Sequence, residues 1–375
     1  MALQTDEYTV RQYEPADRSE ILSLYEQSFG SRSSAWFDWR YVDNPYLPAV
    51  PIHVAEHDDQ VVGARLSLPI PLSAGNTRVL ALMQVDPMVH PDHRRQGLFV
   101  RMAARVHERY ESGPPTVELG FPNESALSAL ETLESELSLH AGVRYPFAEW
   151  FRIQHLDAMV ADSTDDSRLR LLARLGAPVA RGYLRVREAQ APTPTGFEVE
   201  CIDGVPAERL SSLATDDPRT VHVARDEEFY RWRFANPRYD YRTYVASKHG
   251  TATVAVVVGE PAVGGAHAHV ANISEVVPIQ GGPERDAGIA AVLATVTAET
   301  NADGLAAGGA GLDASLLDAY GFRPRRSFPL SVLSDRNYVL ARPLVEEPVE
   351  EWVVGGCRLS DPDRWRLSYC EREIG

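Results

Sequence analysis

Residues 85–111, VDPMVHPDHRRQGLFVRMAARVHERYE, carry the feature that most constrains how this chain can fold. A strand-like run over residues 79–89 meets a corner at Pro91, a short cationic loop follows, and Gly97 begins a helix. An apolar residue recurs at every fourth position, which predicts an amphipathic helix with one face in a core. The apolar row consists of Leu98, Met102, Val106 and Tyr110.

The start of this helix is predicted to bind an anion. The first turn of a helix leaves backbone N–H groups without partners, and the helix dipole attracts negative charge to that end. The glycine at position 97 lets a ligand approach the backbone closely, and Arg94 and Arg95 precede it. The arrangement therefore predicts a strand, a loop and a helix that together bind a pyrophosphate.

Residues 89–98, VHPDHRRQGL, resemble the acetyl-CoA-binding motif of the GNAT superfamily of N-acetyltransferases, V-x-P-x-x-R/Q-x-x-G-x-G/A. Arg94 and Gly97 occupy the positions that this motif requires, whereas Phe99 replaces its final Gly/Ala. Because main-chain amides hold the pyrophosphate in this family, Phe99 can still donate its N–H group. The resemblance implies that the chain binds acetyl-CoA as a cosubstrate.

The order of the expected elements over residues 8–155 also resembles this superfamily. The resemblance implies an α/β (α+β) fold, in which a mixed, mostly antiparallel sheet is flanked by helices. The pattern predicts, in order, a strand at 8–12, a helix at 18–29, strands at 52–56, 61–69 and 79–89, the helix begun by Gly97, a strand at 116–120 and a helix at 125–139.

The resemblance further assigns cofactor contacts. In this fold the fourth and fifth strands splay apart at a bulge, and the pantetheine arm lies between them, hydrogen-bonded to the fourth strand as a further strand would be. Asn123, just past the fifth strand, resembles an asparagine that contacts the same arm. By motif position, the pantetheine is assigned to Pro87, Met88 and Val89, and the pyrophosphate to Arg94, Arg95, Gln96, Gly97, Leu98 and Phe99.

An internal repeat predicts a second copy of the fold. Residues 229–237, FYRWRFANP, parallel residues 37–45, FDWRYVDNP: both contain Trp-Arg-aromatic followed by Asn-Pro, and both precede a pair of expected strands. We therefore predict two tandem GNAT-like domains. The expected organisation is an N-terminal GNAT domain with the acyl-CoA site at 1–155, a helical connector at 156–195, a C-terminal degenerate GNAT-like domain at 196–345 and a C-terminal extension at 346–375.

The second copy is predicted to be degenerate at the cofactor. Residues 284–290, ERDAGIA, keep the spacing R-x-x-G-x-A, but Glu284 and Asp286 flank the arginine. Their carboxylates would repel a pyrophosphate. This pattern favours a structural or substrate-shaping role for the second half.

Acetyl transfer to an amine needs a deprotonated amine, a polarised thioester carbonyl and a proton for the leaving thiolate. A carboxylate in a cleft can act as the base. Asp86 in the fourth strand and Glu118 in the fifth flank the predicted splay and are the candidate catalytic residues; a solvated or salt-bridged carboxylate is the alternative for each. The superfamily's usual acid is a tyrosine in the helix after the fifth strand, and residues 124–142 contain none, so no acid is assigned.

Trp39, Arg40 and Tyr41 are candidates for the wall of an acceptor pocket in the loop after the first helix. Trp232 and Arg233 repeat the pair in the second half. A motif present in both halves favours packing over substrate contact.

The amino-acid composition limits the classes of molecule that this protein is expected to bind. The 375 residues include 53 acids and one lysine, Lys248, and carry a net charge of −16. Acidic charge can steer cationic substrates, but acids spread along the whole chain favour a general surface adaptation, such as halophilic solubility in high salt. Without a basic face, nucleic-acid binding is not expected.

A metal site and a membrane segment are not expected either. The three cysteines are widely spaced, and His53 and His57 fall on an expected strand and its turn, where a spacing of four does not converge. The chain has no run of 18 apolar residues, and its first residues lack the features of a signal peptide, which predicts a cytoplasmic protein. Homo-oligomer formation stays open.

Together these observations predict an acyl-CoA-dependent N-acyltransferase that moves an acetyl group to an amine of a small molecule or a protein. A Fem-like aminoacyl or peptidyl transferase shares the doubled architecture but uses aminoacyl-tRNA, and the intact phosphate loop and missing basic patch disfavour it. A non-catalytic acyl-CoA-binding regulatory protein is a third alternative, which the absent tyrosine keeps open.

Overall fold

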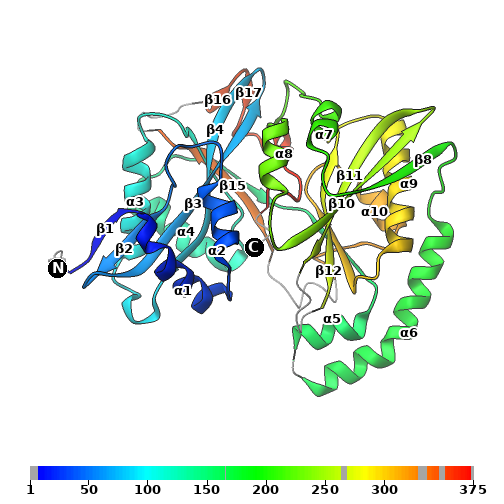
Figure 1. Ribbon diagram of the computed structural model, residues 1–375, viewed down its shortest axis with the longest axis horizontal. Coiled ribbons are helices and arrows are strands. Elements are labelled where there is room, and N and C mark those ends of the chain that lie inside the picture. The colour runs from blue at the N-terminus through cyan, green and yellow to red at the C-terminus, as the bar shows by residue number, and fades with distance from the viewer. Residues whose placement is uncertain (1–6, 165, 263–267, 328–335, 346–350, 373–375) are drawn as a thin grey trace. The chain divides into compact units, whose positions relative to one another are not determined.

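The computed structural model describes residues 7–164, 166–262, 268–327, 336–345 and 351–372. The chain forms two compact units, each with its own sheet (Figure 1). Both sheets are mixed, mostly antiparallel and flanked by helices, which confirms the predicted fold class. Unit 1 comprises Met1–Pro146, Asp217–Ala224 and Asn337–Trp365, and unit 2 comprises Phe147–Asp216, Arg225–Arg336 and Arg366–Gly375.

The sheet of unit 1 has the strand order β1-β2-β3-β4-β5-β15-β6, and β9 pairs with β3. Strands β4 and β5 run parallel, and the other neighbours are antiparallel. The strands are β1 (Thr9–Gln12), β2 (His53–His57), β3 (Gln60–Ala74), β4 (Thr77–Val89), β5 (Val117–Gly120), β6 (Val143–Pro146), β9 (Val221–Val223) and β15 (Tyr338–Pro343), with a small hairpin of β16 (Val353–Val354) and β17 (Cys357–Arg358).

Helix α3 (Leu98–Tyr110) is the amphipathic helix predicted from its apolar row. The first half of that row packs against Ala55 and Val62, and the second half against Leu82 and Leu344. The burial of this row fixes the start of α3 beside the end of β4. The other α-helices of unit 1 are α1 (Arg18–Phe29), α2 (Ser34–Phe37) and α4 (Leu127–Glu136).

The loop expected after the first helix is helical over residues 34–42, which corrects the prediction. Ser33 caps α2 by accepting a hydrogen bond from the N–H of Trp36 at 3.1 Å, and a π-helix (Asp38–Val42) continues it. Aromatic residues have modest helix propensity, and tertiary packing stabilises this short helix instead. The π-helix matters because it directs Arg40 into the interior.

The sheet of unit 2 has the order β14-β7-β13-β12-β11-β10-β8, with β12 and β13 parallel. Helix α9 buries an aliphatic row, including Ile289 and Leu293, against β11. The strands are β7 (Glu149–Ile153), β8 (Phe197–Asp203), β10 (Tyr239–Lys248), β11 (Thr251–Pro261), β12 (Val270–Val277), β13 (Gly304–Gly308) and β14 (Arg323–Pro324). The helices are α5 (Leu156–Ser163), α6 (Ser167–Gln190), α7 (Ala207–Leu213), α8 (Glu227–Arg233), α9 (Pro283–Glu299) and α10 (Ala314–Ala319).

The tandem repeat is present in the structure. The series β2-β3-β4-α3-β5 of unit 1 recurs as β10-β11-β12-α9-β13 in unit 2, and each series contains one parallel pair, next to the long helix. Among the described residues, none of the helices combines the length and apolar character that crossing a bilayer requires.

The units differ from the predicted domains because they are not continuous in sequence. Strand β15, from late in the chain, lies between β5 and β6 of unit 1, whereas β7 joins the sheet of unit 2 although it follows β6 directly. The described parts of the expected extension at 346–375 likewise divide, with 351–365 in unit 1 and 366–372 in unit 2. Local sequence patterns report that a strand forms but not which sheet it joins.

Candidate functional site

The edge of β4 opens beyond its pairing with β5. The two strands pair from Ala81–Val117 to Gln84–Gly120, and β4 continues for five more residues, 85–89. On the β5 side, no described strand pairs with this continuation. Unpaired N–H and C=O groups along a strand edge can bind an extended ligand as an additional strand.

A β-bulge lies in this open stretch of β4. Leu66 of β3 pairs with Val85 and Ala64 pairs with Met88, so that two residues, Asp86 and Pro87, oppose one. Asp86 has φ +41°, in the left-handed region that non-glycine residues rarely adopt. A bulge re-aims the side chain that it carries, and here it directs Asp86 toward the helices after β1.

Three side chains from different elements meet at the bulge. The Tyr25 hydroxyl of α1 donates to Oδ2 of Asp86 at 2.7 Å, and Nη2 of Arg40 donates to the same oxygen at 3.1 Å. Arg40 is 1% exposed, and its guanidinium carbon lies 4.9 Å from the ring centre of Trp36. The Asp86 side chain is 19% exposed. The carboxylate therefore reaches solvent while the groups that hold it are buried.

The loop between β4 and α3 presents groups suited to a phosphate. Gly97 has φ +71°, and a Cβ added there would meet no atom within 4 Å. No described side chain caps the start of α3 at Gly97, so its first N–H groups stay available. Arg94 and Arg95 are exposed beside it. This geometry fits the predicted pyrophosphate site.

The structure explains how the site tolerates Phe99 in place of a small residue. Phe99 is half-buried, and its ring centre lies 5.4 Å from the guanidinium carbon of Arg65 in β3. The ring thus has a packing place within unit 1. The backbone of Phe99 remains in the first turn of α3.

Glu118 lies in a buried cluster of charges. Its oxygens are 3.5 Å from Arg65 Nη2, 3.4 Å from His107 Nε2 and 3.0 Å from Arg342 Nε. Burial by itself would raise the pKa of Glu118, but the interaction with His107 and the charges of Arg342 and Arg65 outweigh it and lower the pKa to about 2. Such a carboxylate is a weak base at neutral pH. The surroundings favour the salt-bridged alternative over a catalytic role.

The predicted acceptor-pocket residues separate into two kinds. Trp39 and Tyr41 are buried, and the Tyr41 ring packs against Phe37 at 5.1 Å between ring centres. Arg40 instead contacts Asp86. In unit 2 the corresponding Arg233 is also buried and donates from Nε to the carbonyl of Cys370 at 2.7 Å. Burial in both copies favours packing for this motif.

Asn123 caps a short helix in the structure. Its Oδ1 accepts a hydrogen bond from the N–H of Ala126 at 2.9 Å, at the start of the 3-10 helix (Glu124–Ala126) that leads into α4. Its contact with a pantetheine stays a prediction. The sequence pattern did not identify Tyr25 as a residue of the site. No local pattern distinguishes a core tyrosine from one whose hydroxyl reaches a distant carboxylate.

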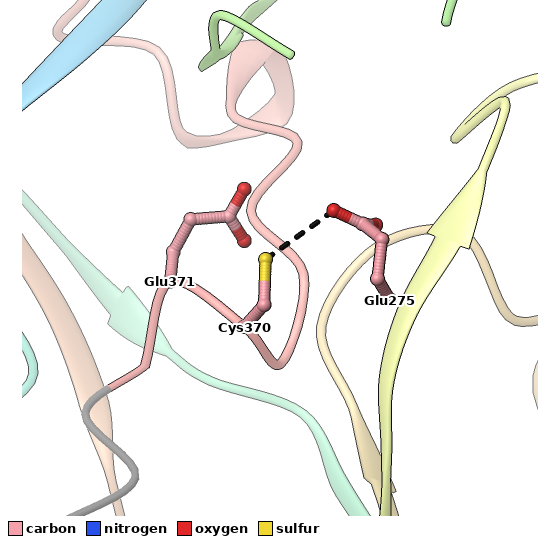
Figure 2. Close-up of side chains that lie close together, drawn as sticks. All are labelled: Glu275, Cys370 and Glu371. Atoms are coloured by element: carbon pink, nitrogen blue, oxygen red, sulfur yellow. Dashed lines mark hydrogen bonds between the residues drawn. The ribbon is translucent and has the colours of Figure 1, made fainter. Parts of the chain in front are cut away.

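In unit 2 the C-terminal segment, residues 366–372, lies beside the place where β12 and β13 separate. Strands β12 and β13 pair only from Val270–Gly304 to Asn272–Ala306, and β12 then bulges at Ser274. Beyond β13, the N–H of Ala310 donates to the carbonyl of Leu367 at 2.6 Å, and Gly309 bridges Ser368. Figure 2 shows Cys370 and Glu371 pointing toward Glu275 of β12.

Arg225 holds this segment to β12. Its Nε lies 2.9 Å from Oε2 of Glu275, and its Nη2 lies 2.5 Å from Oε1 of Glu371 and 3.1 Å from Oγ of Ser368. All of these side chains are buried. The ligand atoms of Glu275, Cys370 and Glu371 are within 4.8 Å of one another, as a metal site would need. Because the Arg225 guanidinium already supplies a positive charge to both carboxylates, the cluster is better described as a buried ion pair network.

The loop of unit 2 differs from its counterpart in unit 1. Arg285 is 7% exposed, and its guanidinium donates to the carbonyls of Pro278 and Gly311, both at 2.6 Å. Arg285 is therefore buried in its own loop, whereas Arg94 is exposed and makes one hydrogen bond to its loop, from Nε to the carbonyl of Val89 at 3.2 Å. Sequence reasoning also missed that residues 276–278, VVP, repeat the Val-x-Pro of the first motif. The longer spacing to the arginine hid the match.

Comparison with known proteins extends these observations. Residues 9–129 match the family model of the acetyltransferase (GNAT) domain. A search among curated proteins gave no match. Solved structures match with low sequence identity, so they show similarity of fold.

Three of these structures cover about nine-tenths of this chain. A GCN5-related N-acetyltransferase from Anabaena variabilis ATCC 29413 is 12% identical over 90% of this chain and 73% of that chain, with a TM-score of 0.56. A probable N-acyltransferase from Enterococcus faecalis V583 is 12% identical, and the match covers 90% of this chain and 72% of that chain with a TM-score of 0.54. A tandem GNAT protein from the clavulanic acid biosynthesis pathway is 14% identical, and the match covers 91% of this chain and 100% of that chain with a TM-score of 0.54.

Proposed function

We propose that unit 1 transfers an acetyl group from acetyl-CoA to an amine. The premise is that this chain carries a GNAT acetyltransferase domain at residues 9–129 within a tandem GNAT fold. The observation that carries the proposal is the open edge of β4 next to an uncapped helix start with exposed arginines. The first can bind an amide-containing arm as a strand, and the second can bind a pyrophosphate.

The residues that would hold acetyl-CoA follow from this arrangement. The backbone of residues 87–89 would pair with the pantetheine arm, because it lies past the last β4–β5 pair. The pyrophosphate would lie at the start of α3, where Gly97 leaves open space and Arg94 and Arg95 add positive charge. Asn123, at the end of the same opening, would contact the arm from the β5 side.

We assign the base to Asp86. The amine nitrogen attacks the thioester carbon, the carbon–sulfur bond breaks, and the amine loses a proton that a neighbouring carboxylate can accept. Asp86 suits this role because it sits at the bulge and reaches solvent. Tyr25 and Arg40 fix its orientation through Oδ2, which leaves Oδ1 for the amine. Glu118 suits it poorly, because its pKa is about 2.

A cationic acceptor also suits the site. An ionised Asp86 attracts an ammonium group, and proton transfer to the carboxylate generates the nucleophile in place. The thiolate can take its proton from water or from the protonated Asp86, since the sequence places no tyrosine in α4. We propose a small-molecule or protein amine as the acceptor and do not assign its skeleton.

Two measurements test the proposal in order. Acetyl-CoA should raise the melting temperature of the whole chain in a concentration-dependent way, because a ligand stabilises the state that binds it. A panel of amines should then give free CoA in an assay of thiol release. Absence of the thermal shift would rule out acyl-CoA binding and would favour the Fem-like alternative. A shift without turnover on any amine would favour a non-catalytic acyl-CoA-binding protein.

A further inference from the structure

Helix α6 of unit 2 carries an unusual set of exposed apolar side chains. Seven large apolar residues on this helix are between 36% and 75% exposed. The opposite side is covered, because Ala173, Ala177 and Leu184 are buried. The helix therefore has a second apolar side that unit 2 does not use. The exposed residues are Leu169, Leu171, Leu172, Leu175, Val179, Tyr183 and Val186.

The exposed face of α6 has the residue spacing of a helix-pairing seam on both sides of a proline. Leu172 and Leu175 precede Pro178, and Val179, Gly182 and Val186 follow it, in steps of three, four, three and four. Pro178 lacks the N–H of a helix hydrogen bond and kinks the helix, so the seam has two segments that meet at this residue. A Cβ added at Gly182 would meet no atom within 4 Å. A glycine in the seam lets a second helix approach closely, and ridges of one helix then pack into grooves of the other.

The area of the face matches what a dimer needs. From their exposed fractions, the seven side chains present on the order of 600 Å² of apolar surface, the upper end of the largest patch on an ordinary monomer. A standard interface buries roughly 800 Å² on each partner, a little more than half of it apolar. The α6 face alone can therefore supply the apolar share of such an interface.

Charge selects the partner. Between Ser167 and Gln190 there are six arginines and one glutamate, so α6 carries +5, while the chain as a whole carries −16 and its remainder −21. A chain of this net charge is repelled by an anionic lipid surface as a whole. The seam positions between 171 and 183 carry no charge. The flanking arginines of two paired helices would repel each other only at the rim, where salt screens them.

We propose that the exposed face of α6 binds the same face of a second copy of this chain in a two-fold symmetric dimer. A two-fold axis brings one patch against itself, so a self-complementary apolar seam is sufficient. The dimer should tighten as salt rises, because salt screens both the arginine rims and the net charge of the two copies. Binding of arginines to anionic lipid would weaken under the same change.

The test is the mass of the full-length chain by analytical ultracentrifugation across a range of salt and protein concentration. The wild type should approach twice the 41.5 kDa chain mass, with tighter association at high salt. A Leu172→Glu/Val179→Glu double variant should dissociate at least about 100-fold more readily, since it places unpaired charges in the seam. Val353→Glu, at an exposed apolar position of β16, is the matched control and should dimerise normally.

A covalent readout guards against variants that fold poorly. In a Cys201→Ser background, which removes the exposed cysteine, a single Cys at position 175 or 179 should give a disulfide-linked dimer on mild oxidation, and one at position 353 should not. A wild type that stays monomeric at every salt and protein concentration would overturn the proposal. So would flotation with phosphatidylglycerol vesicles that the double variant loses while the wild type is monomeric.

Discussion

Both units bulge in the strand that precedes their long helix, at Asp86 and Pro87 in unit 1 and at Ser274 in unit 2. Beside the first bulge, Asp86 is held by Tyr25 and Arg40 and reaches solvent. Beside the second, Glu275 is buried against Arg225 and the C-terminal segment. The same strand geometry thus supports an accessible carboxylate in one unit and an internal ion pair in the other.

The difference shows two ways in which a splayed pair of strands can be accommodated in the same fold. A splayed pair of strands leaves backbone groups unpaired, and something must satisfy them. In unit 2 the chain itself lies along that opening, through the bond from Ala310 to Leu367, and Arg285 braces the neighbouring loop. We infer that unit 2 serves as a scaffold, and the following changes test this contrast from the largest expected effect to the smallest.

Gly97→Glu should abolish acetyl-CoA binding, because it adds bulk and negative charge at the start of α3. Gly282→Glu is the matched change at the start of α9, where a Cβ also meets open space, and it should leave the dissociation constant within about twofold. Isothermal titration of both variants, with melting curves to check folding, makes the comparison. Normal binding by a folded Gly97→Glu protein would remove the cofactor assignment.

Arg225→Ala should destabilise unit 2 by about 3–5 kcal/mol, since it leaves two buried carboxylates without their counter-ion. The free energy of unfolding can be measured by urea denaturation. Arg231→Ala, which breaks an exposed pair with Glu227, is the control and should cost under about 1 kcal/mol. Acetyl-CoA affinity below the unfolding range should persist in both; a large loss in Arg225→Ala would show that unit 2 contributes to the site.

The contributions of Glu118 in unit 1 and Glu275 in unit 2 to folding stability should change with pH in opposite directions. The pKa of Glu118 is lowered to about 2, so its contribution to stability is present above its ordinary pKa of 4.5 and is lost as the pH falls from there toward 2. A shift of this size corresponds to on the order of 3 kcal/mol. Burial raises the pKa of Glu275 although Arg225 opposes it, so folding favours its protonated form and its contribution weakens as the pH rises above 4.5.

Urea denaturation of Glu118→Gln and Glu275→Gln between pH 3 and 7 separates these effects. Each variant should lose the pH dependence of its own carboxylate. If Glu118→Gln kept the full loss of stability on acidification, the low pKa would belong to another group.

Asp86→Asn should lower kcat about 100-fold, the usual range for removing a positioned base, with little change in acetyl-CoA affinity. Asp59→Asn, in the exposed turn after β2, is the control and should behave as wild type. An unchanged kcat in Asp86→Asn would transfer the role of base to another group.

Arg94→Glu should weaken acetyl-CoA binding about tenfold through lost phosphate contact, and Arg285→Glu should leave it nearly unchanged. The second change should lower the melting temperature instead, because Arg285 donates to two backbone carbonyls. Comparable losses of affinity in the two variants would mean that both units bind the cofactor.

Local parts of the site were predictable from the sequence. The position of Gly97 before an amphipathic row predicted the start of α3, because helix starts and periodicity depend on neighbouring residues. The partners of the buried charges were not predictable from the sequence. Tyr25 lies 61 residues from Asp86, and Arg225 lies 146 residues from Glu371. A charge pair across such a distance leaves no periodic trace, so the sequence could not decide between an accessible and a salt-bridged Glu118.

The exchange of strands has a consequence for synthesis of the protein. A ribosome releases the loop between β4 and α3 long before it makes β15, the strand that lies between β5 and β6. Until β15 emerges, a nascent unit 1 exposes strand edges that proteases and chaperones recognise. A chain cut short before β15 therefore leaves the edges of β5 and β6 in unit 1 without the strand that pairs with both.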